Sequence, residues 1–328
     1  MRGGGGSAAD RETSAGAVDE HHRGIPAEPL RPYVAAYTGY RQRGVPPARH
    51  RGLPSPYLTL IFTLDEPLTI VAHPDPGQPP GEYGTLLGGL HSVPALITHA
   101  GAQSGIQVAL RPLGARALLG LPAGELAALD LPAEAVLGGV CAELRDRVRS
   151  AAGWPERFAV LDEILLRRAG LRSAGLPSAG LPSAGLHSAG LHWAAHAGVA
   201  PEVSWAWHEL LREGGATRVS ELAAGTGWSE RHLTSRFRAE IGLAPKAAAR
   251  VVRFDRARKL LVRKLTAGGD YLLADLAADG GYFDQAHLAR EFRALAGCPP
   301  SQWLAEEFRN VQAGTWLDDE SWEHHSST

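Results

Sequence analysis

Cysteine is scarce in this chain, and long apolar runs are missing from it. Cys141 and Cys298 are the two cysteines among 328 residues, too few for a disulfide framework or a four-ligand zinc site. No run approaches the ~20 apolar residues that span a bilayer, and residues 1–24 lack the apolar core of a signal peptide. We therefore expect reduced thiols, no membrane partner and a cytoplasmic protein.

Signatures of catalysis and metal binding are missing as well. His208 and Glu209 lack the second histidine of a zinc protease motif, and neither a Gly-x-Ser-x-Gly elbow nor a phosphate-binding glycine loop is present. His187, His192 and His196 have no acidic or cysteine ligand beside them. We predict that the chain is not an enzyme, has no catalytic residues, and uses neither a metal nor a cofactor.

The composition is otherwise that of a globular protein of about two domains, with 44% hydrophobic and 21% charged residues. Residues 1–24 show no periodicity and are predicted to be a disordered leader. Apolar residues then alternate with polar ones from Tyr57 to Leu64, as in a strand whose one face carries Leu58, Leu60 and Phe62. Segments 68–72, 95–99 and 105–110 repeat this style, which predicts a small antiparallel sheet.

Helical spacing replaces this alternation after Pro112. Apolar residues from Leu137 to Val148 and from Pro155 to Leu166 predict two or three helices, with Cys141 on the apolar stripe. Residues 25–170 are therefore predicted to form a sensor or oligomerisation domain, and the sequence leaves both roles open. A sensor pocket would be lined by Tyr57, Phe62, His91 and His99.

A five-residue unit, Leu-x-Ser-Ala-Gly, repeats within residues 171–198. Its regular glycines and two prolines exclude a stable helix, so we predict a flexible linker. Residues 311–328 are predicted to be an acidic disordered tail.

A longer repeat fills the region between linker and tail. GWSERHLTSRFRAEIGLAP begins at Gly227 and GYFDQAHLAREFRALAGCPP at Gly281. A short apolar helix, a glycine turn and a second helix in each copy give the spacing of a helix-turn-helix motif. The inner faces are predicted to carry Val219, Leu222, Ala223, Leu233, Phe237 and Ile241 in the first copy, and Leu272, Leu276, Ala277, Leu288, Phe292 and Leu295 in the second.

The segment between the copies favours DNA binding. Pro245 begins a predicted helix of about 20 residues, or ~30 Å, which is close to one duplex turn of ~34 Å. From Arg231 to Lys264 there are 11 basic and 2 acidic residues, a net charge of +9 over 34 residues in a chain of net charge −2. Such a one-sign run points to phosphate as its partner.

The second copy, GYFDQAHLAREFRALAGCPPSQWL, resembles the signature of the AraC/XylS family of transcription regulators, and the resemblance covers about residues 205–305. It implies a DNA-binding domain, which we place at residues 199–310. The residues implied to read bases are Arg231, Thr234, Ser235, Gln285, Ala289 and Arg290. The residues predicted to bind phosphate are Ser229, Arg238, Lys246, Arg253 and Arg293.

The predicted fold class is α+β: a small antiparallel β-sheet domain followed by helices, then an all-α domain in which a long helix joins two helix-turn-helix motifs. The predicted function is that of a sequence-specific DNA-binding transcription regulator, modulated by a small molecule or by self-association. The alternative is a constitutive DNA-binding protein whose N-terminal domain only dimerises. Expected partners are double-stranded DNA, with RNA polymerase, a small-molecule effector and a second copy of the chain as further candidates.

Overall fold

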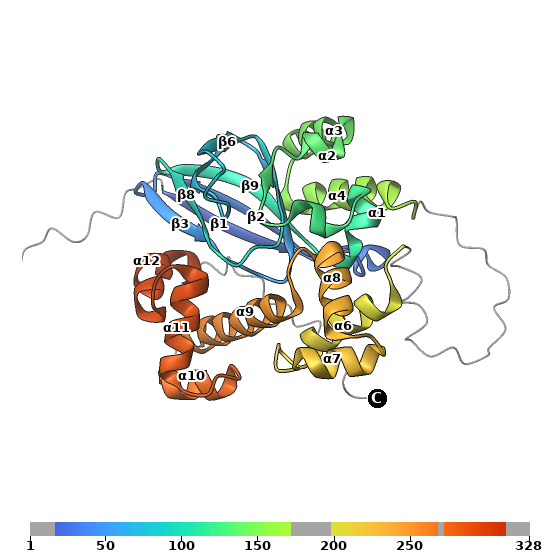
Figure 1. Ribbon diagram of the computed structural model, residues 1–328. Coiled ribbons are helices and arrows are strands. Elements are labelled where there is room, and N and C mark those ends of the chain that lie inside the picture. The colour runs from blue at the N-terminus through green and yellow to red at the C-terminus, as the bar shows by residue number, and fades with distance from the viewer. Residues whose placement is uncertain (1–16, 172–197, 268–271, 313–328) are drawn as a thin grey trace, which may run out of the picture.

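The computed structural model describes residues 17–171, 198–267 and 272–312 (Figure 1). A β-rich N-terminal part and an all-helical C-terminal part confirm the α+β prediction. The linker repeat and most of the predicted tail lie outside the described residues, as do His187, His192 and His196. Within the described ranges, no helix combines the length and apolarity needed to cross a bilayer.

The strands of the N-terminal domain form two antiparallel sheets, whereas the sequence predicted one. The six-stranded sheet has the order β1 (Val18–Gly24), β2 (Val34–Arg43), β9 (Ala102–Leu110), β4 (Leu58–Thr63), β7 (Thr85–Gly88) and β10 (Asp130–Leu131). The four-stranded sheet has the order β3 (Ala48–Gly52), β8 (Ala95–His99), β5 (Leu68–Ala72) and β6 (Gly81–Tyr83).

Strand β4 shows how both faces of the larger sheet are used. Leu58, Leu60 and Phe62 are fully buried on the face that the helices cover, as the alternation predicted. Ile61 points the other way and packs with Ile70 of the smaller sheet. Both faces of this strand are therefore apolar at its centre, which is typical of a strand buried on both sides.

The predicted disordered leader is wrong for its last residues, because Val18–Gly24 form the edge strand β1. It pairs with β2 along its whole length, from Val18 opposite Arg43 to Gly24 opposite Tyr37. The ring of His22 stacks on Trp154 at 5.2 Å between ring centroids. The backbone ladder holds this strand, and its side chains are mostly polar, so no apolar alternation marked it in the sequence.

Helices cover one face of the larger sheet (Figure 1). The apolar spacing from Leu137 to Val148 is divided between two helices at Gly138, whose φ of 59° ends the first of them. Cys141 is buried there without a disulfide partner, and burial raises the pKa of its thiol. The helical segments are η1 (Glu28–Leu30), η2 (Pro112–Gly114), α1 (Ala115–Leu119), η3 (Ala123–Leu126), α2 (Glu134–Leu137), α3 (Gly139–Ser150) and α4 (Trp154–Arg168).

The C-terminal domain consists of two small helical cores joined by the long helix α9, which contributes to both. Leu272 was predicted on an inner face, and this is wrong: it lies at the N-cap of α10 with 67% of its surface exposed. The helices are α6 (Pro201–Arg212), α7 (Val219–Thr226), α8 (Glu230–Ile241), α9 (Pro245–Thr266), α10 (Leu273–Asp279), α11 (Gln285–Ala296) and α12 (Pro300–Gln312).

Candidate nucleic-acid interface

The first helix-turn-helix unit consists of α7, a glycine turn and α8. Gly227 ends α7 in the left-handed conformation, with φ of 71°. Ser229 then caps α8, since its hydroxyl accepts a hydrogen bond from the backbone N–H of His232 at 3.3 Å. Leu233, Phe237 and Ile241 are fully buried, as predicted. The opposite face of α8 is therefore turned outward.

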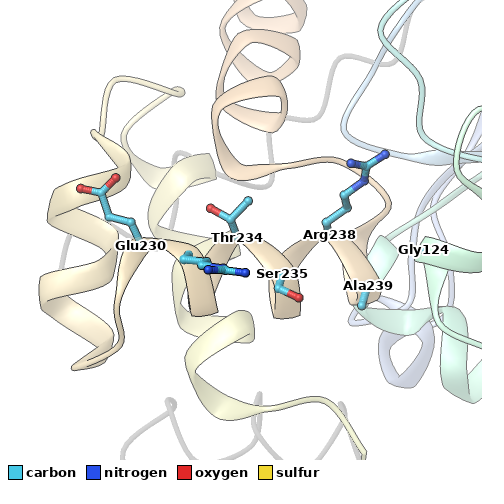
Figure 2. A pocket seen from close by; sticks show the side chains of 7 residues that line it. Gly124, Glu230, Thr234, Ser235, Arg238 and Ala239 are labelled. Carbon is cyan, nitrogen blue, oxygen red and sulfur yellow. The ribbon is translucent and has the colours of Figure 1, made fainter.

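The outward face of α8 is polar (Figure 2). Arg231 and Ser235, both predicted to read bases, are exposed, and Thr234 is half-buried. With Glu230 and Arg238 they line a shallow hollow that continues to Gly124 of the N-terminal domain. The structure thus brings the three predicted readers of this unit together on one helix face.

The second unit repeats this construction with α10 and α11. Asp284 caps α11 by accepting a hydrogen bond from the backbone N–H of His287 at 2.6 Å. Gln285, the first residue of α11, and Arg290, in the middle of the helix, are exposed, and Ala289 is half-buried. The inner face of α11, formed by Leu288, Phe292 and Leu295, is buried as predicted.

Some of the basic residues between Arg231 and Lys264 form salt bridges within the C-terminal domain. Arg250 pairs with Glu291 at 2.8 Å and Lys264 with Asp279 at 2.8 Å, so each links α9 to the second unit. Asp255 is buried between two cations of its own helix; burial opposes its ionisation, but Lys259 and Arg258 lower the pKa of its carboxyl. Within the described residues, seven cations of the run have no acidic partner: Arg231, Arg236, Arg238, Lys246, Arg253, Arg256 and Arg263.

The predicted phosphate-binding residues differ in their exposure and in the hydrogen bonds that they already make. Arg238, Lys246 and Arg293 are exposed, and Ser229 is exposed while it caps α8. Arg253 is half-buried between the two units: it donates a hydrogen bond to the carbonyl of Gly215 at 2.6 Å, and its guanidinium lies 5.8 Å from the ring centre of Tyr282. Its side chain therefore joins the two units.

Helix α9 contributes to the cores of both units. It has 22 residues, which at 1.5 Å per residue give about 33 Å. Two recognition helices that enter successive major-groove segments on one side of a duplex lie about 34 Å apart. The length of α9 is therefore of the same order as one duplex turn.

The N-terminal domain touches both units, and no sequence pattern predicted these contacts. Arg116 of α1 forms two hydrogen bonds of 2.8 Å with the carboxylate of Glu240 in α8. At the second unit, Arg51 of β3 pairs with Glu306, and its backbone N–H donates to Glu307 at 2.9 Å. These residues are far apart in sequence, so only the tertiary fold brings them together.

A cavity of about 170 Å³ lies at this domain junction. Its surface is mainly apolar, and its polar lining residues include Tyr40, His50 and Gln107 from the sheets, together with Arg258 of α9 and Glu307 of α12. Burial and the nearby His99 lower the pKa of His50 to about 4, so its imidazole is neutral at pH 7. Its Nδ1 has no hydrogen-bond partner in the part of the chain that the structure describes.

Of the four residues predicted to line a sensor pocket, His91 does so. The prediction is wrong for Phe62, whose ring is fully buried in the core beneath the helices. His99 borders a neighbouring hollow with Thr98 and Glu82. Tyr57 lies at the domain junction, where Lys259 Nζ is 5.5 Å from its ring centre.

Two family models match separate parts of the chain. Residues 222–306 match a helix-turn-helix domain family, and residues 22–132 match a domain of unknown function (DUF6597). No curated protein matches the chain.

Solved structures similar to the chain include ToxT from Vibrio cholerae, at 11% identity, covering 82% of this chain and 97% of that chain with a TM-score of 0.42. Another is ToxT with an unsaturated fatty acid bound, at 10% identity, 82% and 94% coverage and a TM-score of 0.43. The C-terminal domain of AraT, a response regulator from Geobacillus stearothermophilus, has 18% identity, 33% and 86% coverage and a TM-score of 0.29.

The signature that begins at Gly281 lies within the matched helix-turn-helix region, and the two motifs and their joining helix are present in the fold. Residues 222–306 of the chain therefore form a helix-turn-helix domain of the matched family.

Proposed function

We propose that this protein recognises a specific DNA sequence with α8 and α11 in two successive major-groove segments. The observation that carries the proposal is the pair of capped helices with exposed outward faces, one in each of the two units that pack on α9. Arg231, Thr234 and Ser235 are the proposed readers of the first segment, and Gln285, Ala289 and Arg290 those of the second. An exposed arginine can donate two hydrogen bonds to guanine O6 and N7.

Phosphate contacts position these readers on the duplex. Arg238, Lys246 and Arg293 have exposed side chains beside the two outward faces and are the proposed cationic contacts. Ser229 is the proposed uncharged contact, because its place at the N-terminus of α8 also offers free backbone N–H groups to an anion. For Arg253 a phosphate contact requires release of the Gly215 carbonyl, so we rank it below the others.

We further propose that the cavity at the domain junction binds a small polar effector. Its volume of about 170 Å³ is near that of an engineered cavity that holds benzene. Neutral His50 can donate and accept a hydrogen bond, and Tyr40 and Gln107 add further groups of both kinds. These hydrogen-bonding groups in a mainly apolar cavity can orient a small ligand, which favours a sensor over a domain that only dimerises.

Binding-site selection from a randomised duplex tests the DNA-reading proposal. The full chain should enrich two short sequence blocks about one helical turn apart, and Arg231→Ala and Arg290→Ala should each blur one block. Arg212→Ala is the matched control, since this exposed arginine of α6 pairs with Glu209, away from both readers. Failure of the wild-type chain to enrich any sequence would rule the proposal out.

A thermal-shift screen of small polar compounds tests the effector proposal. A ligand at 100 times its Kd stabilises the folded chain by ~2.7 kcal/mol. The shift should shrink in Gln107→Leu, which removes a lining amide. A shift that is the same in this variant would place the ligand elsewhere.

A further inference from the structure

The two helix-turn-helix units differ by one residue just before the recognition helix. In each unit a left-handed glycine is followed by an aromatic residue whose ring contacts the histidine of the next helix: Trp228 on His232, and Tyr282 on His287. In the first unit the capping residue follows the aromatic directly. In the second unit Phe283 stands between the aromatic and the cap.

Phe283 is held in place by its backbone while its ring projects into solvent. Its side chain is 93% exposed, more than that of any other large apolar residue in the described ranges. Its backbone N–H donates to Nδ1 of His287 at 3.4 Å, and the next residue, Asp284, is fixed as the helix cap. The exposed ring is thus part of an ordered turn at the start of α11.

Two positions on α11 near this ring are also apolar, unlike their counterparts in α8. When the buried leucines Leu233 and Leu288 are aligned, Arg231 of the first unit corresponds to Ala286, and Thr234 corresponds to Ala289. Ala286 is exposed and Ala289 half-buried, and residues three apart lie on the same helix face. At these positions the second unit therefore has methyl groups, with a phenyl ring beside them, whereas the first unit has the hydrogen-bond donors of Arg231 and Thr234.

The N-terminal residues of a recognition helix are those that meet base edges in the major groove. Neither a phenyl ring nor an alanine methyl can hydrogen-bond to a base, but both can contact the C5-methyl group of thymine. We propose that Phe283 is a specificity-determining residue that contacts a thymine methyl, so that the second unit selects thymine where the first selects by hydrogen bonds. This inference rests on the proposed sequence-specific DNA binding.

Replacement of thymine by deoxyuridine in the selected duplex tests the inference, because it removes only the methyl group. With the full wild-type chain, one such replacement in the block read by α11 should weaken binding about fourfold, the equivalent of one buried methyl group. Phe283→Ala should bind the thymine duplex about as weakly as the wild type binds the deoxyuridine duplex, and should not respond to that replacement. Phe283→Leu should recover part of the response.

Leu272→Ala is the control, because Leu272 is an exposed apolar residue of the same unit at the start of α10. It should keep the full deoxyuridine penalty. The assignment would be overturned if Phe283→Ala showed the same loss of affinity on deoxyuridine replacement as the wild type. It would also be overturned if Phe283→Ala lost transcriptional activity with unchanged DNA binding, because that result would indicate a protein partner for this ring. If the wild type selects no sequence at all, the DNA-reading proposal fails instead.

Discussion

Gly124 offers the most direct test of the contact between the N-terminal domain and the recognition helix α8. A Cβ atom at this position would lie 2.0 Å from the carbonyl oxygen of Ala239, whereas ordinary contact begins at 3.4 Å. The φ of Gly124 is not in the left-handed region, so alanine causes no backbone strain of its own. Gly124→Ala therefore acts on the domain contact alone.

The size of the effect follows from what this displacement breaks. Both neighbouring groups are backbone, so they must separate by about 1.4 Å, the difference between 3.4 and 2.0 Å. The two 2.8 Å hydrogen bonds between Arg116 and Glu240 would then exceed hydrogen-bonding distance. Hydrogen bonds to charged groups contribute ~1.5–3 kcal/mol, and the Arg116 side chain is 38% exposed, so we expect a loss near ~1.5 kcal/mol.

Amide hydrogen exchange measures this loss at the contact itself. A loss of ~1.4 kcal/mol corresponds to tenfold faster exchange, and we expect it at Ala127 and Gly242, which lie against each other across the contact. Gly139→Ala is the control, since no atom lies within 4 Å of the added methyl group. If Gly124→Ala exchanges like Gly139→Ala, the two domains do not pack in solution as described.

Three further predictions concern DNA affinity, folding and pH. Binding of the full chain to its selected duplex should have a slope of log K against log salt of about −5 to −7, because six to eight exposed cations meet phosphate; a slope near zero would contradict the electrostatic argument. Phe292→Ala should lose ~3–5 kcal/mol of stability in urea unfolding, because this ring is fully buried against Phe254 and Trp303, whereas the exposed Arg290→Ala should unfold like the wild type. The pKa of His50 in the folded protein is about 4, below the ordinary value of 6.5. The contribution of neutral His50 to stability is therefore complete above pH 6.5 and is lost as pH falls from 6.5 to 4, by at most ~1.4 kcal/mol per pH unit. His50→Gln should show a shallower decline of stability with falling pH, and equal declines would show that His50 is not the group responsible.

The C-terminal domain was well predicted because its signals are local. Leu233, Phe237 and Ile241 recur at helical spacing, and the glycine turn and the capping serine lie within a few residues of them. The prediction of the inner face was wrong at Leu272, because the sequence spacing alone did not show that α10 begins one residue later. Four of the six predicted base readers are exposed. This exposure was predictable because the buried residues of each helix define which of its faces is turned outward.

The N-terminal domain and the domain contact were harder to predict because their signals are long-range. Strand β1 is stabilised by its backbone pairing with β2, and the distribution of strands over two sheets depends on pairings that no single segment encodes. Arg116 and Glu240 are 124 positions apart. Nothing in either neighbourhood distinguishes them from solvated charges, so their pairing could not be inferred from composition or periodicity.

The placement of the cavity determines how an effector would act on DNA binding. Arg258 of α9 and Glu307 of α12 both line the cavity, and Glu307 accepts a hydrogen bond from the backbone of Arg51. A ligand can shift the arrangement of the domains only by its differential affinity for the two arrangements. A tenfold change in DNA affinity needs ~1.4 kcal/mol, which is within the ~1.5–3 kcal/mol of one hydrogen bond to a charged group. The loss or gain of a single such contact at the cavity wall, next to the helix that spaces both readers, is therefore enough to couple an effector to DNA.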